Sequence, residues 1–472
     1  MTKLGQQLLD LLGTTNNFLW GYLIIAVLIL CALYFTVRSG CVQFRMLGEM
    51  MKLLTESGTV HKTDGEERKH ISSFQAFTVA LASRVGTGNL AGVASAIFVG
   101  GPGAVFWMWV MALLGAATAF VESTLAQLYK LKGKDSFIGG PAYYMQIGLR
   151  KRWMGVLFAI LITMTFGMAN QVVQSNTICD SLADTFSWNK FLIGAVMTVV
   201  TLFIIFGGIQ RVSKFSAIVV PFMAVGYIIL ALFIVAINIT ELPHVFKIII
   251  GSAFGMQQAA GGMVGAAMMQ GIKRGLFSNE AGEGSAPNAA ATADISHPVK
   301  QGLLQSLGVF TDTLVICTCT AFIIILSGLY TGADDGIILT TKALESEIGT
   351  IGRYFISAAV FLFAYSTIIG NYYYGETNVR FITSRKGALL GYRIICGITV
   401  LVGGIVTLQT AWSMVDLCMG LMTLCNLIAI VFLSNRAFRL LKNYRDQKKA
   451  GKNPEFHRDM LPEWKDEIPC WE

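Results

Sequence analysis

Two polar, glycine-containing segments interrupt apolar stretches of this 472-residue chain. The first reads SRVGTGN at residues 83–89, and the second reads GIKRGLFSNEAGEGS at residues 271–285. In a helix that crosses a membrane, each glycine costs about 1 kcal/mol and a central arginine costs at least about 2.5 kcal/mol. Non-helical backbone survives at that depth only where it faces protein or a water-filled cavity. Both segments therefore indicate broken helices that border a buried polar site.

The first segment offers two kinds of backbone ligand. A half-helix that starts at Gly88 presents the free N–H groups of Gly88, Asn89 and Leu90, which suit an anionic oxygen such as a carboxylate. The half-helix that ends before it leaves the carbonyl groups of Ala82 and Val85 unpaired, and such oxygens suit a hard cation such as Na⁺. We therefore expect a carboxylate and a cation side by side at this break.

Several carboxyl groups also lie within apolar stretches: Glu122, Asp312, Asp416, Glu280 and Glu283. An ionisable residue inside a membrane is a functional candidate by default. A structural ion pair of Glu122, Asp312 or Asp416 with one of the basic residues Arg84, Lys273 or Arg274 explains them equally well.

The composition defines the class of protein. Hydrophobic residues make up 54% of the chain and charged residues 14%, whereas an average soluble protein has about 25% charged residues. Runs of about 20 apolar residues are long enough to span a bilayer. The sequence therefore predicts an all-α polytopic membrane protein with eleven spans, near residues 18–37, 72–98, 103–130, 153–178, 190–208, 215–238, 259–284, 300–328, 352–377, 389–408 and 411–435. Residues 243–258 are expected to form a short interfacial helix.

The charges between the spans alternate. Basic residues gather at every second connection, including 38–71, 130–152 and 436–449, whereas the connections around 180–184 and 334–347 are acidic. Because cytoplasmic loops carry the excess of Lys and Arg, this pattern predicts an N-terminus outside and a C-terminus in the cytoplasm. An odd number of spans also requires the two termini to lie on opposite sides of the membrane, in agreement with this orientation.

Apart from the first span, the ten remaining spans divide into two sets of five, and each set begins with a broken helix. Five spans per set insert the two sets in opposite orientations. Interrupted helices at matching positions of inverted repeats indicate a transporter site at the membrane midplane. We therefore expect four parts: an extracellular N-terminus, accessory span and cytoplasmic loop (1–71), a first repeat (72–242), a second repeat (243–435) and a cytoplasmic tail (436–472).

The two segments are also recognisable. VGTGNLAG at 85–92 and FSNEAGEGSAP at 277–287 resemble the alanine/glycine:cation symporter family, and the likeness extends from the first span to about residue 435. The resemblance implies a LeuT-type fold with one extra N-terminal helix. It also implies Na⁺-coupled uptake of small amino acids across the bacterial inner membrane. The first motif is similar to the first broken helix of LeuT-type transporters.

The resemblance further implies which residues bind. The substrate carboxylate would be held by Thr87, Gly88 and Asn89, and the ammonium group and side chain would meet Phe277 and Ser278. Sodium would bind the carbonyl groups of Ala82 and Val85 and the hydroxyl groups of Ser366 and Thr367. Arg84 stands where LeuT-type sodium symporters have a small residue near a second sodium site, which favours a single coupled cation.

Polar residues on the fourth span are less specific. Phe166, Asn170 and Gln171 are candidates for substrate contact, and Gln174 lies on the same helix face as Asn170. An interhelical hydrogen bond is the alternative explanation for each amide. We favour contact for Asn170 and Gln171 over Gln174.

Enzyme motifs are absent, since the chain has no GxxxxGK[ST] loop and no GxSxG elbow. Energy must then come from an ion gradient, and the sequence predicts a sodium-coupled importer of alanine and glycine that works by alternating access. A proton-coupled symporter with Glu280 or Glu283 as carrier, and a channel or receptor on the same fold, are the alternatives. The expected partners are the small-molecule substrate and membrane lipid, with no nucleic acid and no obligate protein partner.

Overall fold

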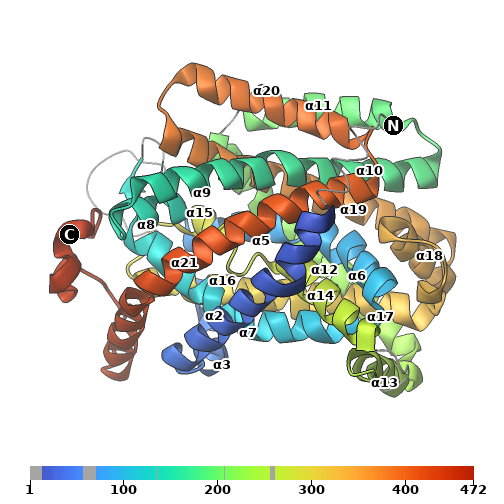
Figure 1. Cartoon of the computed structure of the whole chain (residues 1–472), viewed down its shortest axis with the longest axis horizontal. Helices are drawn as coiled ribbons and strands as arrows, with labels where there is room; N and C mark the ends of the chain where they lie inside the picture. The colour runs from blue at the N-terminus through green and yellow to red at the C-terminus, as the bar shows by residue number, and fades with distance from the viewer. Residues whose placement is uncertain (1–12, 57–70, 134–135, 207, 256–260, 472) are drawn as a thin grey trace.

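The computed structural model is largely helical (Figure 1) and describes residues 13–56, 71–133, 136–206, 208–255 and 261–471. Within these residues, eight helical segments are long and apolar enough to cross a membrane: Gly13–Ser39, Gly103–Leu128, Arg152–Phe186, Ser216–Ile237, Pro298–Ser327, Thr350–Ile382, Lys386–Gly403 and Leu408–Lys449. The other expected spans, 72–98, 190–208 and 259–284, coincide with shorter or broken helices. The all-α membrane fold is therefore confirmed, whereas the count of eleven spans stays a prediction.

The α-helices follow one another as α2 (Ile24–Ser39), α3 (Val42–Arg45), α4 (Leu47–Glu56), α5 (Ser73–Arg84), α6 (Val93–Gly100), α7 (Gly103–Leu128), α8 (Pro141–Ile147), α9 (Arg152–Met164), α10 (Asn170–Phe186), α11 (Lys190–Ile205), α12 (Gly208–Ile237), α13 (Leu242–Ala253), α14 (Gly261–Asn279), α15 (Ala286–Ala290), α16 (Pro298–Val309), α17 (Thr318–Ser327), α18 (Gly336–Ile348), α19 (Thr350–Ile382), α20 (Lys386–Gly403) and α21 (Leu408–Lys449). Segments of π-helix extend or join them: η1 (Leu19–Leu23), η2 (Gly88–Gly92), η3 (Thr165–Ala169) and η5 (Phe310–Cys317). Short 3-10 helices are η4 (Ile239–Glu241), η6 (Leu329–Thr331), η7 (Arg458–Met460) and η8 (Pro462–Glu467), and β1 (Leu131–Lys132) pairs antiparallel with β2 (Phe137–Ile138).

Small residues let the central helices pack closely. Helix α7 contacts α2, α14 and α16, and α11 lies beside α20 along one edge of the molecule (Figure 1). A Cβ added at Gly302 of α16 would lie 2.8 Å from the Phe120 carbonyl oxygen of α7. Such close backbone contact is how helices associate where water gives no hydrophobic driving force.

The first expected break is confirmed. Helix α5 starts with a capping box between Ser72 and Gln75 and ends at Arg84. Val85 then leaves helical geometry with φ −78° and ψ 87°, and η2 begins at Gly88. The interruption is shorter than residues 83–89, because Ser83 and Arg84 still belong to α5.

The second break begins later than expected. Helix α14 continues through Gly271 and Gly275 to Asn279, and the helix is interrupted only between Glu280 and Ser285. The prediction of a break from residue 271 was wrong, because these glycines serve packing: a Cβ at Gly271 would lie 2.3 Å from the Ala104 carbonyl oxygen of α7. Inside the break, Glu280 (φ 56°), Gly282 (φ 96°) and Gly284 (φ 84°) have positive φ.

Three features lie outside the expected spans. Helix α13 begins at Leu242 and ends at Ala253, so it matches the start of the expected interfacial helix, whose residues 256–258 lie outside the described residues. Helix α18 forms between the eighth and ninth expected spans, where no helix was predicted. Helix α21 continues to Lys449, well beyond residue 435. After it, the chain folds back, and Trp471 is buried with its indole N–H donating to the Gln127 carbonyl oxygen.

Candidate binding site

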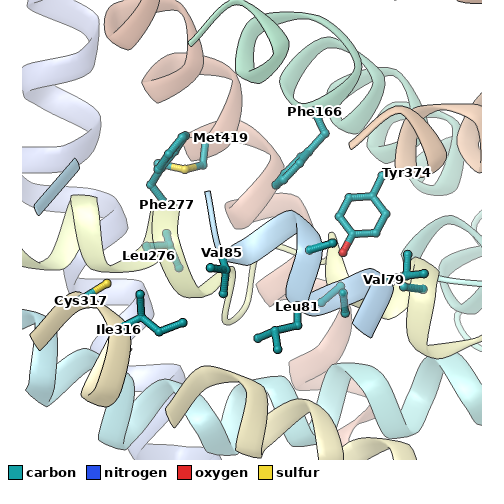
Figure 2. Close-up of a cluster of buried hydrophobic side chains, with 14 of the residues drawn as sticks. Val79, Leu81, Val85, Phe166, Leu276, Phe277, Ile316, Cys317, Tyr374 and Met419 are labelled. Atoms are coloured by element: carbon teal, nitrogen blue, oxygen red, sulfur yellow. The ribbon is translucent and has the colours of Figure 1, made fainter. Parts of the chain in front are cut away.

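The first break lies against the C-terminal end of α14 in the interior, next to the second break. A Cβ placed on Gly88 would lie 3.1 Å from Cα of Ser278 and 3.1 Å from Cδ1 of Phe277. Figure 2 shows Val85 at the end of α5, with Leu276 and Phe277 of α14 on one side and Phe166 and Tyr374 on the other. All these side chains are buried. The predicted carboxylate-binding and side-chain-binding segments are therefore adjacent in space.

The expected sodium ligands converge on one hydroxyl group. Thr367 Oγ1 on α19 lies 2.8 Å from the Ala82 carbonyl oxygen, 3.3 Å from that of Val85 and 3.1 Å from that of Phe363. A hydroxyl has one proton, so it can satisfy only one of three carbonyl oxygens at a time. Oxygen atoms in excess of donors are the ligand set that a hard cation takes, and the residues present therefore fit Na⁺.

Ser366, the fourth expected sodium ligand, is not part of this group of contacts. The Ser366 hydroxyl donates to the Phe363 carbonyl oxygen at 2.9 Å, and within the described residues it forms no hydrogen bond with the carbonyl oxygens of Ala82 and Val85. Sequence reasoning did not include Phe363. The signal was present, since Ser and Thr three and four residues after a helical carbonyl commonly bond back to it.

Protein side chains occupy part of the first break. The Thr87 N–H donates to Gln174 Oε1 at 3.0 Å, and the Gly86 N–H donates to Asn89 Oδ1 at 2.9 Å. The Thr87 hydroxyl is buried and has no hydrogen-bond partner within the described residues. It is thus available to a ligand, and its contact with a substrate carboxylate stays a prediction.

On the fourth span, Gln174 makes the direct contact with the first break. Its amide also donates to Asn170 Oδ1 at 2.8 Å, so Asn170 reaches the break through Gln174. The Gln171 amide donates to the Ile368 carbonyl oxygen of α19 at 3.0 Å, and the Phe166 ring lies 5.5 Å from the Tyr374 ring. Sequence reasoning ranked Gln174 below Asn170 and Gln171, because spacing alone does not show which way a helix face turns.

Asp312 joins η2, which follows the first break, to the end of α14, which precedes the second break. Asn89 Nδ2 donates to Asp312 Oδ1 at 2.7 Å, and the hydroxyl groups of Ser278 and Thr313 donate to Oδ2 at 2.8 and 2.9 Å. The side chains of Asn89 and Ser278 therefore meet at this carboxyl group. A substrate held by these residues would meet their backbone groups or displace these bonds.

Glu122 holds the second break from α7. The N–H groups of Gly282 and Gly284 each donate to one of its carboxyl oxygens at 3.1 Å, and Asn426 Nδ2 of α21 adds a bond at 2.9 Å. The break's orphan donors are thus satisfied by a single carboxyl group. Neither Glu122 nor Asp312 forms an ion pair within the described residues.

Glu280 connects the second break to α5. Its carboxyl oxygens lie 2.5 Å from the Ser83 hydroxyl and 2.6 Å from the Ser285 hydroxyl. Ser83 Oγ also lies 2.7 Å from Asn371 Oδ1 of α19. Because Ser83 follows Ala82, this network borders the sodium candidate.

A buried ion cluster lies next to Phe277. Lys273 Nζ is 2.6 Å from Asp416 Oδ2, and Arg274 Nη1 is 3.0 Å from Asp416 Oδ1. The Arg274 guanidinium group also lies 3.9 Å from the centre of the Trp412 ring, whose centroid is 4.7 Å from that of Phe277. The structural explanation therefore holds for Asp416.

Replacing Asp416 by asparagine is expected to destabilise the protein by about 3–5 kcal/mol, because two buried cations lose their counter-ion. Thermal unfolding in detergent would measure the loss as a lower Tm. Lys273→Met, which keeps the Arg274 pair, is the control and should cost less than Asp416→Asn. An unchanged Tm for Asp416→Asn would contradict a structural role for the cluster.

Comparison with known proteins gives the family. A model of the sodium:alanine symporter family matches residues 5–458. The probable sodium/glutamine symporter GlnT of Bacillus subtilis is 50% identical over 468 residues, which cover 99% of this chain and 97% of that protein. The sodium/proton-dependent alanine carrier protein of Bacillus sp. strain PS3 is 39% identical over 405 residues, covering 82% of this chain and 91% of that protein.

Solved structures agree on the fold. MhsT in complex with L-phenylalanine aligns with a TM-score of 0.53 at 14% identity, covering 80% of this chain and 99% of that chain. This likeness concerns architecture alone, and it confirms the expected LeuT-type fold. With a family model that covers nearly its whole length, the chain belongs to the sodium:alanine symporter family.

Proposed function

We propose that this protein imports small neutral amino acids, alanine and glycine in particular, across the bacterial inner membrane by sodium-coupled alternating access. Its family consists of amino-acid symporters, so the chain is a cation-coupled transporter and not an enzyme. The observation that carries the choice of Na⁺ is the convergence of the Ala82, Val85 and Phe363 carbonyl oxygens on Thr367 Oγ1. The substrate carboxylate would lie beside it, against Thr87 and Gly88.

We propose eleven spans in the membrane, with the N-terminus outside and the C-terminus in the cytoplasm. Residues 72–242 and 243–435 would form the two inverted repeats, and the scaffold and bundle built from them would rock around the central site. The alternation of basic and acidic connections supports this orientation.

One sodium ion supplies enough energy for accumulation. Its inward movement through 100 mV releases about 2.3 kcal/mol, and a tenfold Na⁺ gradient adds about 1.4 kcal/mol. Together these concentrate a neutral zwitterion roughly 500-fold.

Glutamine is the second candidate substrate, because a relative of 50% identity is named a probable sodium/glutamine symporter. A hydrophobic pocket discriminates by only about 1–3 kcal/mol for each methylene group. The Phe277 ring lies against Gly88 and the Trp412 ring packs on Phe277, so the positions of these two rings in the loaded state would decide whether a long side chain fits.

Replacing Na⁺ with choline at fixed pH is expected to lower the initial rate of alanine uptake at least about tenfold, because the carbonyl cluster then lacks its cation. Counterflow of radiolabelled alanine, glycine and glutamine in proteoliposomes measures the effect and ranks the substrates. Undiminished uptake in choline would contradict sodium coupling and favour a proton carrier such as Glu280 or Glu283. Failure to accumulate any of the three would favour a channel or receptor.

A further inference from the structure

Four buried carboxyl groups share one buried guanidinium group in the interior. Arg84 acts electrostatically on each of the set, which comprises Glu122, Glu280, Glu283 and Asp312. Three of these carboxyl groups accept the hydrogen bonds described above. Glu283 differs, because neither of its carboxyl oxygens has a hydrogen-bond partner in the part of the chain that the structure describes.

The position of Glu283 is fixed by its two neighbours. Gly282 and Gly284 adopt positive φ and donate their N–H groups to Glu122. These glycines pack against apolar atoms of several helices: Thr118 of α7, Leu427 of α21, Leu28 of α2, Pro141 of α8 and Phe158 of α9. Glu283 itself is fully buried.

The charged groups that act on Glu283 are two carboxyl groups and one cation. Glu280 of the same break and Glu122 of α7 disfavour its negative charge, and Arg84 of α5 favours it. On α8, the Tyr144 hydroxyl is engaged with Asn426. Among the described residues, therefore, Glu283 has no hydrogen-bond donor of its own, and the cation that favours its charge, Arg84, also acts on three other acids.

An ionised carboxyl group in such surroundings is strongly unfavourable, since it has lost water and gained no hydrogen bond. Binding a proton removes the charge. We propose that Glu283 is a proton-binding site that is protonated while the second break is closed, as in this structure, and ionised when the break opens to water. The inference rests on the proposed function, because the event that closes the break is the binding of amino acid and Na⁺.

This assignment fixes the direction in which pH changes the affinity for the amino acid. In an open, hydrated break a glutamate is ionised at neutral pH. On closing, the carboxylate takes one proton from solvent to become a carboxylic acid, and no other bond changes. Linkage then requires the affinity for the amino acid to weaken as pH rises, by up to about tenfold for each pH unit.

The test measures how many protons the protein takes up when the amino acid binds. Purified protein in weakly buffered detergent at about pH 7.5, with a pH-sensitive dye, receives alanine in the presence of Na⁺. We expect uptake of about one proton per protein, and a Kd for alanine that rises with pH. The variant Glu283→Gln should bind alanine with a flat pH dependence and take up no proton.

Glu376→Gln is the matched control. Glu376 is another buried carboxyl group, on α19, but it has cationic partners in Arg380 at 2.6 Å and Arg393 at 3.7 Å. This variant should keep the proton uptake and the pH dependence of the wild type.

Three results would overturn the inference: wild-type protein that binds alanine without taking up a proton, a Glu283→Gln variant that takes up the same number, or a variant whose only change is a weaker dependence on Na⁺. The wild-type measurement needs no variant, so poor folding of Glu283→Gln leaves the test intact. Failure of the proposed function would show separately, as absence of Na⁺-dependent binding of any amino acid, and the inference would fall with it.

Discussion

Replacing Gly86 by alanine is expected to lower sodium-dependent amino-acid binding at least about 100-fold. A Cβ at this position would lie 2.3 Å from Thr367 Oγ1 and 2.9 Å from Gln174 Oε1. Real atoms do not approach this closely, so the Thr367 hydroxyl must leave the Ala82 and Val85 carbonyl oxygens, and Gln174 must leave the Thr87 N–H. Loss of supporting contacts alone typically costs 10–100-fold in metal affinity, and here the ligand set itself is displaced.

The measurement is equilibrium binding of labelled alanine over a range of Na⁺ concentrations, with thermal unfolding to show that the variant is folded. Gly226→Ala on α12 is the control, because a Cβ there meets nothing within 4 Å. The isosteric change Thr367→Val should raise the half-saturating Na⁺ concentration at least about tenfold, whereas Thr367→Ser keeps the hydroxyl and should retain tight binding. Wild-type sodium dependence in Gly86→Ala would show that the cation binds elsewhere.

Replacing Glu122 by alanine is expected to destabilise the protein by about 2–6 kcal/mol. The N–H groups of Gly282 and Gly284 would lose their acceptor inside the molecule, and each buried donor left without a partner costs about 1–3 kcal/mol. In the closed arrangement of this structure the region between α7 and α21 is packed, so the two N–H groups would have no replacement acceptor there. The conformation of the second break would then be lost before any effect on a bound substrate could be measured.

Thermal unfolding in detergent and the yield of monodisperse protein measure this change. Glu122→Gln keeps one acceptor oxygen and should fall between wild type and alanine. Asp334→Ala is the control, because its pair with Lys342 is exposed and such pairs contribute about 0–1 kcal/mol. A Tm for Glu122→Ala within the range of that control would mean that the break does not depend on this carboxyl group.

The two breaks show where reasoning from sequence succeeded and where it failed. The first was placed within two residues of each of its ends, because its glycines coincide with a real change in backbone direction after Arg84. In the second segment, Gly271 and Gly275 have the same appearance in the sequence but serve close packing on α7. The sequence does not distinguish a glycine that permits a turn from a glycine that permits close helix packing, because the difference depends on which part of the protein lies against it.

The candidate site shows the same division. The family resemblance placed Ala82, Val85 and Thr367 together, and the structure brings these three into contact. It could not indicate that the Asn89 and Ser278 side chains meet at Asp312, a carboxyl group whose role was left open. Their binding of a substrate therefore stays a prediction.

The sequence by itself determined that the chain crosses a membrane, that a helix is broken at Gly86 and Gly88, and that the broken ends present backbone dipoles. These properties act locally, through the length of apolar runs and the cost of glycine in a helix. The tertiary structure alone decided which polar groups meet, such as Thr367 with Ala82 across 285 residues and Glu122 with Gly282 across 160 residues. Inside a packed membrane protein each buried donor must find an acceptor among whatever neighbours the helix contacts provide, and those contacts are not encoded at any one position.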